Sequence, residues 1–205
     1  MWTIPAYWSD AKAHLRSVDS TLAAIIDAHE DPPLRSKGSV FETLIHAIVG
    51  QQISAVAAAA VWGRFVALVG EVTPVAVLAQ DADTLRGVGL SGRKVEYILG
   101  LAQDHAWVED HDWSALDDDA VRKALVALRG VGPWTAEMVL IFSLLRPDVF
   151  PLGDIGVIRS IEGLYAGGAR LPLEEIESIG APWAPYRTVA TWYLWRHLDA
   201  EPVEY

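Results

Sequence analysis

A glycine-bearing turn between two helical runs constrains this sequence more than any other segment. Apolar residues recur at helical spacing over residues 116–128 and 135–145, and Gly130-Val-Gly132-Pro133 separates the two runs. Gly130 can end the first helix in a left-handed backbone conformation at little cost. Pro133 suits the first turn of the second helix, where its missing N–H is no loss. The segment therefore predicts a hairpin of two helices.

The same turn has the features of a phosphate site. Gly132 lets the backbone approach a ligand closely. The N–H groups near Thr135, at the start of the second helix, can hold a phosphate. An ordinary αα-hairpin is the alternative, because short motifs often occur by chance. The flanking apolar runs, the Gly-hydrophobic-Gly core and the small Ala136 agree with one another, which favours a hairpin that binds DNA.

The rest of the chain follows the same helical period and shows no persistent strand alternation. One apolar run extends over residues 40–68, and Ser114 with Asp117 fits a capping box at the start of the hairpin. Pro and Gly breaks between the runs predict about eight to ten short helices. We therefore expect an all-α fold in a single domain of residues 1–205, with the hairpin at 117–145 and no N-terminal β-domain.

Composition narrows the chemistry. The chain has no cysteine, which excludes disulfides, thiolate catalysis, Cys-ligated zinc and Cys-held iron–sulfur clusters. Its six histidines lack metal-ligand spacing, so we expect no metal site. Neither a signal peptide nor an apolar stretch of the roughly 20 residues that span a membrane is visible. We expect a cytoplasmic protein without a membrane partner.

The formal net charge of -11 argues against a nucleic-acid partner, because phosphate binding usually needs a basic surface. Charge summed over the whole chain says little about one cleft, however. Acidic residues cluster at 117–119 and 174–175, which can lie far from bound DNA. If DNA is the partner, this charge predicts modest affinity and strong salt sensitivity.

A second glycine-rich segment, over residues 85–94, is a looser version of the hairpin turn. Arg93 and Lys94 within it can meet DNA phosphate. A solvated helix start explains the two cations equally well.

Asp154 follows a loop that contains Pro and Gly, and it precedes an apolar helical run. The simplest interpretation is a helix N-cap, worth about 1 kcal/mol. A catalytic role is compatible with the cap, because a helix N-terminus favours negative charge. A carboxylate there can stabilise the oxocarbenium-like sugar that forms as an N-glycosidic bond breaks. It can also orient or deprotonate the attacking water.

A hairpin, a helix and then a Gly/Pro loop that carries Asp resemble the helix-hairpin-helix–Gly/Pro–Asp DNA glycosylases. Within that superfamily the chain is similar to the alkylation-repair branch, the 3-methyladenine DNA glycosylase II type. The resemblance covers residues 20 to 200 approximately and implies two helical subdomains around a central cleft. It rests on the segments Ile48–Ser54, Gly130–Ala136, Phe150–Gly156 and Trp183–Arg187.

The resemblance also implies roles for individual residues. Asp154 matches the catalytic aspartate, in a catalytic loop of residues 146–156. Gln52 falls where the family inserts a side chain into the gap left by a flipped nucleotide. The implied base pocket contains Trp134, Met138 and Trp195. Together with the residues named above, the predicted DNA contacts are Gln51, Gln52, Gly130, Gly132, Thr135, Arg93 and Lys94.

Trp134 lies where relatives with lyase activity carry a Schiff-base lysine, so the resemblance implies a monofunctional enzyme in which Asp154 acts through water. The chain has nine tryptophans, and packing in the core is the simplest role for most of them. An aromatic wall also attracts a cationic alkylated purine, by about 0.5–2 kcal/mol. Such a base is already a good leaving group, and a damaged pair flips out more easily.

The sequence therefore predicts a monomeric, monofunctional glycosylase that excises alkylated bases, of the 3-methyladenine and 7-methylguanine type, from double-stranded DNA. Two alternatives stay open: a glycosylase for another damaged base, and a non-catalytic helix-hairpin-helix module that binds DNA. No cofactor is predicted. A monovalent cation held by backbone carbonyls of the hairpin also stays open.

Overall fold

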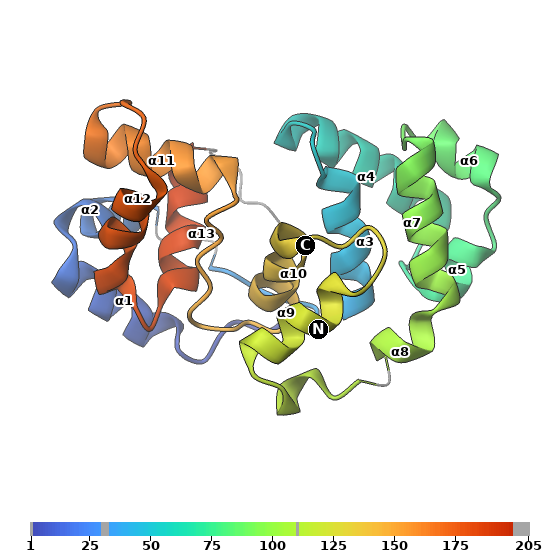
Figure 1. Cartoon of the computed structure of the whole chain (residues 1–205), viewed down its shortest axis with the longest axis horizontal. Helices are drawn as coiled ribbons and strands as arrows, with labels where there is room; N and C mark the ends of the chain where they lie inside the picture. Colours follow the sequence, from blue (N-terminus) through green and yellow to red (C-terminus); the bar gives the residue numbers. More distant parts are fainter. Residues whose placement is uncertain (1, 30–32, 110, 199–205) are drawn as a thin grey trace. The chain divides into compact units, whose positions relative to one another are not determined.

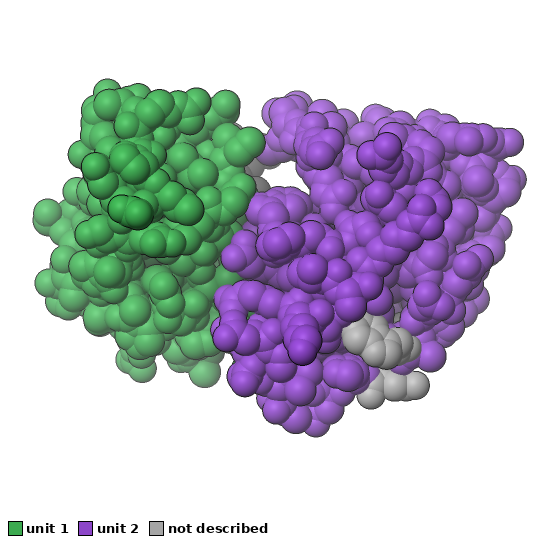
Figure 2. All heavy atoms as spheres, in the orientation of Figure 1, with its two compact units in different colours: residues 1–37, 140–204 green, residues 38–139, 205 purple. Residues whose placement is uncertain are grey.

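The computed structural model describes residues 2–29, 33–109 and 111–198. Within these ranges the regular structure is helical (Figure 1), apart from one isolated antiparallel bridge between Thr3 and Ser36. This confirms the predicted all-α class. The chain divides into two compact units, shown in different colours in Figure 2. Unit 1 contains residues 1–37 and 140–204, and unit 2 contains residues 38–139.

Unit 1 is built from two chain segments that are distant in sequence. Its last helix packs against α1, α2 and α11 and is buried along most of its length. A helix that is covered on several sides belongs to the core, so the side chains of α13 are held firmly. The elements of unit 1 are α1 (Trp8–Val18), α2 (Ser20–Ala28), α11 (Ile155–Ala166), α12 (Leu173–Gly180), the 3-10 turn η3 (Ala181–Trp183) and α13 (Arg187–Leu198).

Unit 2 is continuous in sequence and is organised around α3, which packs against α4, α7, α8 and α10. Nine of the eleven residues of α3 are buried, so this helix forms the centre of the unit. The elements of unit 2 are α3 (Val40–Gly50), α4 (Ala55–Val69), α5 (Pro74–Leu78), α6 (Ala82–Gly87), α7 (Gly92–Gln103), α8 (His105–Glu109), η1 (Trp113–Ala115), α9 (Asp118–Val126) and α10 (Pro133–Met138). A π-helical turn, η2 (Val139–Ser143), follows α10.

The hairpin forms as predicted, between α9 and α10, which pack against each other. Gly130 adopts a left-handed backbone with φ +89°, and Pro133 is the first residue of α10. Ala136 is fully buried. Gly132 has an ordinary extended backbone, with φ -98° and ψ 177°. Only the first of the two glycines is therefore required by the backbone of the turn.

The expected number of helices, about eight to ten, is wrong: thirteen α-helices lie in the part of the chain that the structure describes. The prediction missed helix starts that are marked by an Asp or Ser cap. Asp19 accepts the N–H groups of Thr21 and Leu22 and so begins α2, with only Asp19 itself between α1 and α2. Ser54 caps α4, which divides the run over 40–68 into two helices.

The capping box predicted at the start of the hairpin is also wrong. Asp117 caps α9 by itself, because its carboxylate accepts the N–H of Ala120 at 2.8 Å. Ser114 lies in η1, and its hydroxyl donates to Asp112 at 2.6 Å. An aspartate is as good an N-cap as serine, so no upstream serine is needed here.

Within the described ranges, no helix has both the length and the apolar composition needed to cross a membrane. The single domain over residues 1–205 and the cleft between two subdomains stay predictions.

The turn glycine should be intolerant of substitution. A Cβ atom at Gly130 would lie 2.4 Å from Cγ of Tyr97, and φ there is positive. Strain and overpacking should together lower the free energy of unfolding of Gly130→Ala by about 2–4 kcal/mol. Gly163→Ala is the control, because it lies inside α11 with no atom within 4 Å of the added Cβ. The free energy of unfolding of Gly163→Ala, measured by urea unfolding, should rise by about 0.5–1 kcal/mol. Equal changes in the two variants would contradict the prediction.

Candidate active site

Asp154 is the N-cap of α11, as its position in the sequence predicts. Its Oδ1 accepts the backbone N–H of Val157 at 2.8 Å. The same oxygen accepts the indole N–H of Trp195, from α13, at 3.0 Å. One carboxylate oxygen therefore joins the start of α11 to the core helix of unit 1, and the two hydrogen bonds fix the direction of the carboxylate.

Gly156 makes this approach possible. A Cβ atom there would lie 3.0 Å from Oδ1 of Asp154 and 3.3 Å from Cδ1 of Trp195. Contacts this short would push the carboxylate and the indole apart. Sequence reasoning did not name Gly156 as a site residue, although the pattern Gly153-Asp154-Ile-Gly156 contained the signal.

Trp195 is also held through its ring face. Phe142 stacks on it with ring centroids 5.6 Å apart and an angle of 12° between the planes. Phe142 is buried, whereas Trp195 is half-buried. A carboxylate and an electron-rich ring thus lie side by side in unit 1, and both attract positive charge.

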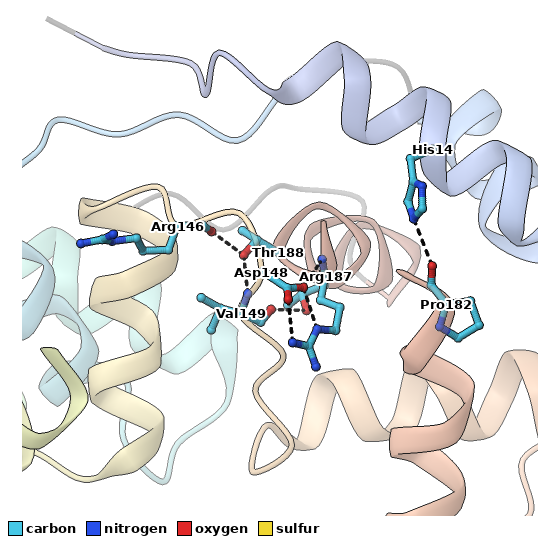
Figure 3. Close-up of polar contacts among 8 residues, drawn as sticks. His14, Arg146, Asp148, Val149, Pro182, Arg187 and Thr188 are labelled. Atoms are coloured by element: carbon cyan, nitrogen blue, oxygen red, sulfur yellow. Dashed lines mark hydrogen bonds and ion pairs between the residues drawn. The ribbon is translucent and has the colours of Figure 1, made fainter. Parts of the chain in front are cut away.

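The first part of the predicted catalytic loop, residues 146–156, is bound to α13 by an ion pair (Figure 3). Nε of Arg187 donates to Oδ1 of Asp148, and Nη2 of Arg187 donates to Oδ2, each at 2.7 Å. Burial raises the pKa of the Asp148 carboxyl, but the hydrogen bonds and charge of Arg187 outweigh burial and leave that pKa below its usual value. The hydrogen bond to Asp148 in turn raises the pKa of Arg187.

Thr188 adds a second fastening beside the ion pair (Figure 3). Its hydroxyl donates to the carbonyl of Arg146 at 2.6 Å and accepts the N–H of Val149 at 2.9 Å. Its own N–H donates to the carbonyl of Pro147 at 3.1 Å. The first residues of the loop that leads to Asp154 are therefore bound to α13, the helix that also carries Trp195. Sequence reasoning did not find Asp148 or Thr188, because their partners lie about 40 residues away.

Three of the predicted DNA contacts come together in unit 2. The side-chain amide of Gln51 donates to the carbonyl of Gly130 and to Oγ1 of Thr135, both at 3.0 Å. Gln51 thus ties the end of α3 to the hairpin turn. Thr135 is 1% exposed, so its side chain serves this internal contact.

Gln52 lies in the four residues between α3 and α4, which we call the Gln52 loop (residues 51–54). The side chain is exposed, and the backbone is left-handed with φ +59°. A non-glycine residue in this conformation costs about 1–3 kcal/mol and persists only where its surroundings enforce it. Such strain is concentrated at functional sites, which fits the predicted contact of Gln52 with DNA.

The two cations of the second glycine-rich segment differ. Arg93 is exposed at the start of α7. The ammonium of Lys94 instead donates to the carbonyls of Val49 and Gln51, at 2.7 and 2.8 Å. Burial lowers the pKa of Lys94.

The remaining predicted pocket residues belong to unit 2, whereas Asp154 and Trp195 belong to unit 1. Trp134 is half-buried at the second position of α10, and Met138 is buried at its last position. The described part of the chain contains no cluster of three His, Asp or Glu side chains that could hold a metal ion. The hairpin cation stays a prediction, and the carbonyl of Gly130 already accepts a hydrogen bond.

Comparison with known proteins identifies the family to which the chain belongs. A family model described as HhH-GPD superfamily base excision DNA repair protein matches residues 45–185. The chain belongs to this superfamily. The membership confirms the resemblance read from the hairpin and the Gly/Pro loop that carries Asp.

Individual members of the superfamily are also similar. The DNA-3-methyladenine glycosylase of Bacillus subtilis is 32% identical, over 78% of this chain and 57% of the relative, so the chain spans little more than half of that protein's length. The solved structure of the Schizosaccharomyces pombe 3-methyladenine DNA glycosylase Mag1, in complex with abasic DNA, gives a TM-score of 0.81 at 28% identity, covering 91% of this chain and 95% of that one. The solved structure of the Bacillus halodurans DNA-3-methyladenine glycosidase gives a TM-score of 0.71 at 34% identity, covering 96% of this chain and 91% of that one.

The ion pair between Asp148 and Arg187 predicts a pH-dependent stability. Because the folded pKa of Asp148 is lowered, its contribution is fully present above the ordinary aspartate pKa and is lost as pH falls through the folded value. Asp148→Asn should lower the free energy of unfolding by about 1–2 kcal/mol at pH 7. The difference in free energy of unfolding between variant and wild type, measured by urea unfolding, should shrink as the pH falls below about 4.

Asp27→Asn is the matched control for this prediction. It breaks the ion pair between Asp27 and Arg16, in which the Arg16 side chain is 35% exposed and the Asp27 side chain is 66% exposed. An exposed pair contributes little, so the control should change stability by less than about 0.5 kcal/mol at pH 7. A gap for Asp148→Asn that stays constant down to about pH 2 would disprove the assignment.

Proposed function

We propose that this protein is a monofunctional DNA glycosylase that hydrolytically removes alkylated bases from double-stranded DNA in base excision repair. The observation that carries the proposal is the contact between Asp154 and Trp195, in a chain that belongs to the HhH-GPD superfamily. The named relatives are 3-methyladenine glycosylases, which supports alkylated bases as the substrate class.

The charge of the site fits a cationic substrate. A purine alkylated at N3 or N7 carries positive charge, and the sugar gains positive charge as the glycosidic bond breaks. The indole of Trp195, stacked on Phe142, offers a cation–π surface worth about 0.5–2 kcal/mol. The neighbouring carboxylate of Asp154 stabilises the oxocarbenium-like sugar. A cationic base leaves as a neutral molecule, so the site needs no general acid.

Water completes the reaction. Its oxygen attacks C1′ of the sugar as the bond to the base breaks, and the bonding electrons leave with the base. Asp154 orients this water and accepts its proton. Oδ1 is fixed by Val157 and Trp195, so the carboxylate is preorganised for the developing charge. Trp134 supplies no amine for a Schiff base, and we therefore expect no lyase activity.

Features of unit 2 support DNA as the partner. A Cβ atom at Gly132 would meet no protein atom within 4 Å, and the backbone there is extended. Neither packing nor conformation of the protein requires this glycine, so close approach of an external group explains it better. Binding of abasic DNA by Mag1 supports the same partner. We further propose that the protein acts as a monomer.

Asp154→Asn tests the chemistry and leaves the cap in place. Asparagine accepts the same hydrogen bonds at an N-cap as aspartate does, so the variant should fold normally. Loss of the negative charge should reduce single-turnover release of base from methylated duplex DNA by about 10²–10³-fold or more. Affinity for a duplex with an abasic-site analogue should stay within about threefold of wild type.

The alternatives give different outcomes in the same assay. If the wild-type protein releases no base from methylated DNA but releases an oxidised or deaminated base, the lesion class is wrong. If it binds DNA and releases no base from a panel of lesion duplexes, it is a binding module and the proposal fails.

Trp195→Phe tests whether the indole N–H directs the carboxylate. Phenylalanine keeps an aromatic ring that can stack on Phe142 but cannot donate to Oδ1 of Asp154. The rate of the chemical step should fall about 10- to 150-fold, the loss expected for one hydrogen bond to a charged group. Binding to abasic DNA should change little. Trp192→Phe, a buried tryptophan of the same helix, is the control, and an equal loss of rate there would contradict the assignment.

A further inference from the structure

Lys94 occupies an unusual position for a cation. It is the third residue of α7, and positive charge is unfavourable at a helix N-terminus. Its ammonium reaches the other helix, α3, and donates to the carbonyls of Val49 and Gln51 at 2.7 and 2.8 Å. Cations are favourable at a helix C-terminus. The end of α3, which packs against α7 (Figure 1), therefore explains the lysine better than α7 does.

The carbonyls at the end of α3 support this role. A helix leaves its last carbonyls without helical partners. The carbonyl of Ile48 accepts the N–H of Gln51 at 3.3 Å, and that of Gly50 accepts the N–H of Ile53 at 3.5 Å. The carbonyls of Val49 and Gln51 accept Lys94 instead. The two strongest of these contacts, judged by distance and charge, both come from the ammonium.

Gln51 is held from two sides, and Gln52 follows it directly. The backbone carbonyl of Gln51 accepts Lys94, while its side chain donates to Gly130 and Thr135 of the hairpin. Gln52 is exposed and left-handed, so it needs support from its surroundings. Its neighbour provides that support, through one tie to α7 and one tie to the hairpin.

We propose that Lys94 is a positioning residue: it holds the Gln52 loop so that Gln52 projects toward DNA, and it is not itself a phosphate contact. This replaces the phosphate role that the sequence indicated for Lys94. The inference rests on the proposed function, because it takes DNA as the partner that Gln52 contacts. In this proposal, one lysine helps to fix the position of the Gln52 loop relative to the hairpin.

The salt dependence of DNA binding separates the two roles of Lys94. Lys94→Met keeps the length of the side chain and removes the ammonium. Loss of a phosphate contact would weaken binding to every duplex and reduce the slope of log K against log salt by about one. Loss of positioning should leave that slope unchanged. Lys123→Met removes an exposed cation of α9 in the same unit and is the matched control.

Base unstacking reports the position of Gln52 without catalysis. The probe is a duplex that carries 2-aminopurine beside an abasic-site analogue, and its fluorescence rises when the bases unstack. Lys94→Met should reduce this rise, and it should slow single-turnover base release about 10- to 100-fold, as expected for a misplaced contact. Lys123→Met should match the wild type in both. An unchanged fluorescence rise in Lys94→Met would overturn the proposal.

A double-mutant cycle tests whether Lys94 acts through Gln52. If it does, Lys94→Met combined with Gln52→Ala should be no slower than Gln52→Ala alone. Losses that multiply would show independent roles and overturn the proposal. If Lys94→Met does not fold by circular dichroism, Lys94→Gln serves the same measurements, since it also removes the charge. The fluorescence and salt measurements need no base release, so they still test the inference if the proposed glycosylase activity fails.

Discussion

The hydrogen bonds to Oδ1 of Asp154 connect the secondary structure of unit 1 to its proposed chemistry. The N–H of Val157 comes from the first turn of α11, and the N–H of Trp195 comes from the core helix α13. The same atom therefore begins one helix and fixes the site to another. An N-cap stabilises the protein by about 1 kcal/mol, so the group that would do the chemistry also supports the fold. Active-site carboxylates often cost stability, and this position avoids much of that conflict.

The acidic composition has a structural explanation that the net charge alone does not give. Several aspartates cap helices, and each accepts a backbone N–H at the start of its helix. They include Asp19 of α2, Asp81 of α6, Asp117 of α9 and Asp154 of α11. Many short helices need many caps, so a chain of this architecture accumulates carboxylates without a need for acidic binding surfaces. A net charge of -11 is therefore weak evidence about the partner.

Local rules predicted the parts of the fold that depend on near neighbours. The left-handed Gly130, Pro133 at the start of α10 and the cap at Asp154 all follow from the conformational limits of one or two residues. Contacts between distant residues could not be predicted in this way. The donors to Oδ1 of Asp154 illustrate the difference, because Val157 is three residues away and Trp195 is 41 residues away. The Gln52 conformation was equally hidden, since glutamine shows no preference for a left-handed backbone.

The division of the chain between the two units has a consequence for folding. Unit 2 is one continuous segment, so the contacts among its helices all lie within residues 38–139 and can form once that segment has been made. Unit 1 cannot, because α1 and α2 pack on α13, more than 150 residues further along the chain. During synthesis, the apolar faces of α1 and α2 would stay uncovered until α13 has left the ribosome. Unit 2, already folded, would then act as a compact spacer that shortens the loop to be closed. The unit that holds Asp154 is thus the last to be completed.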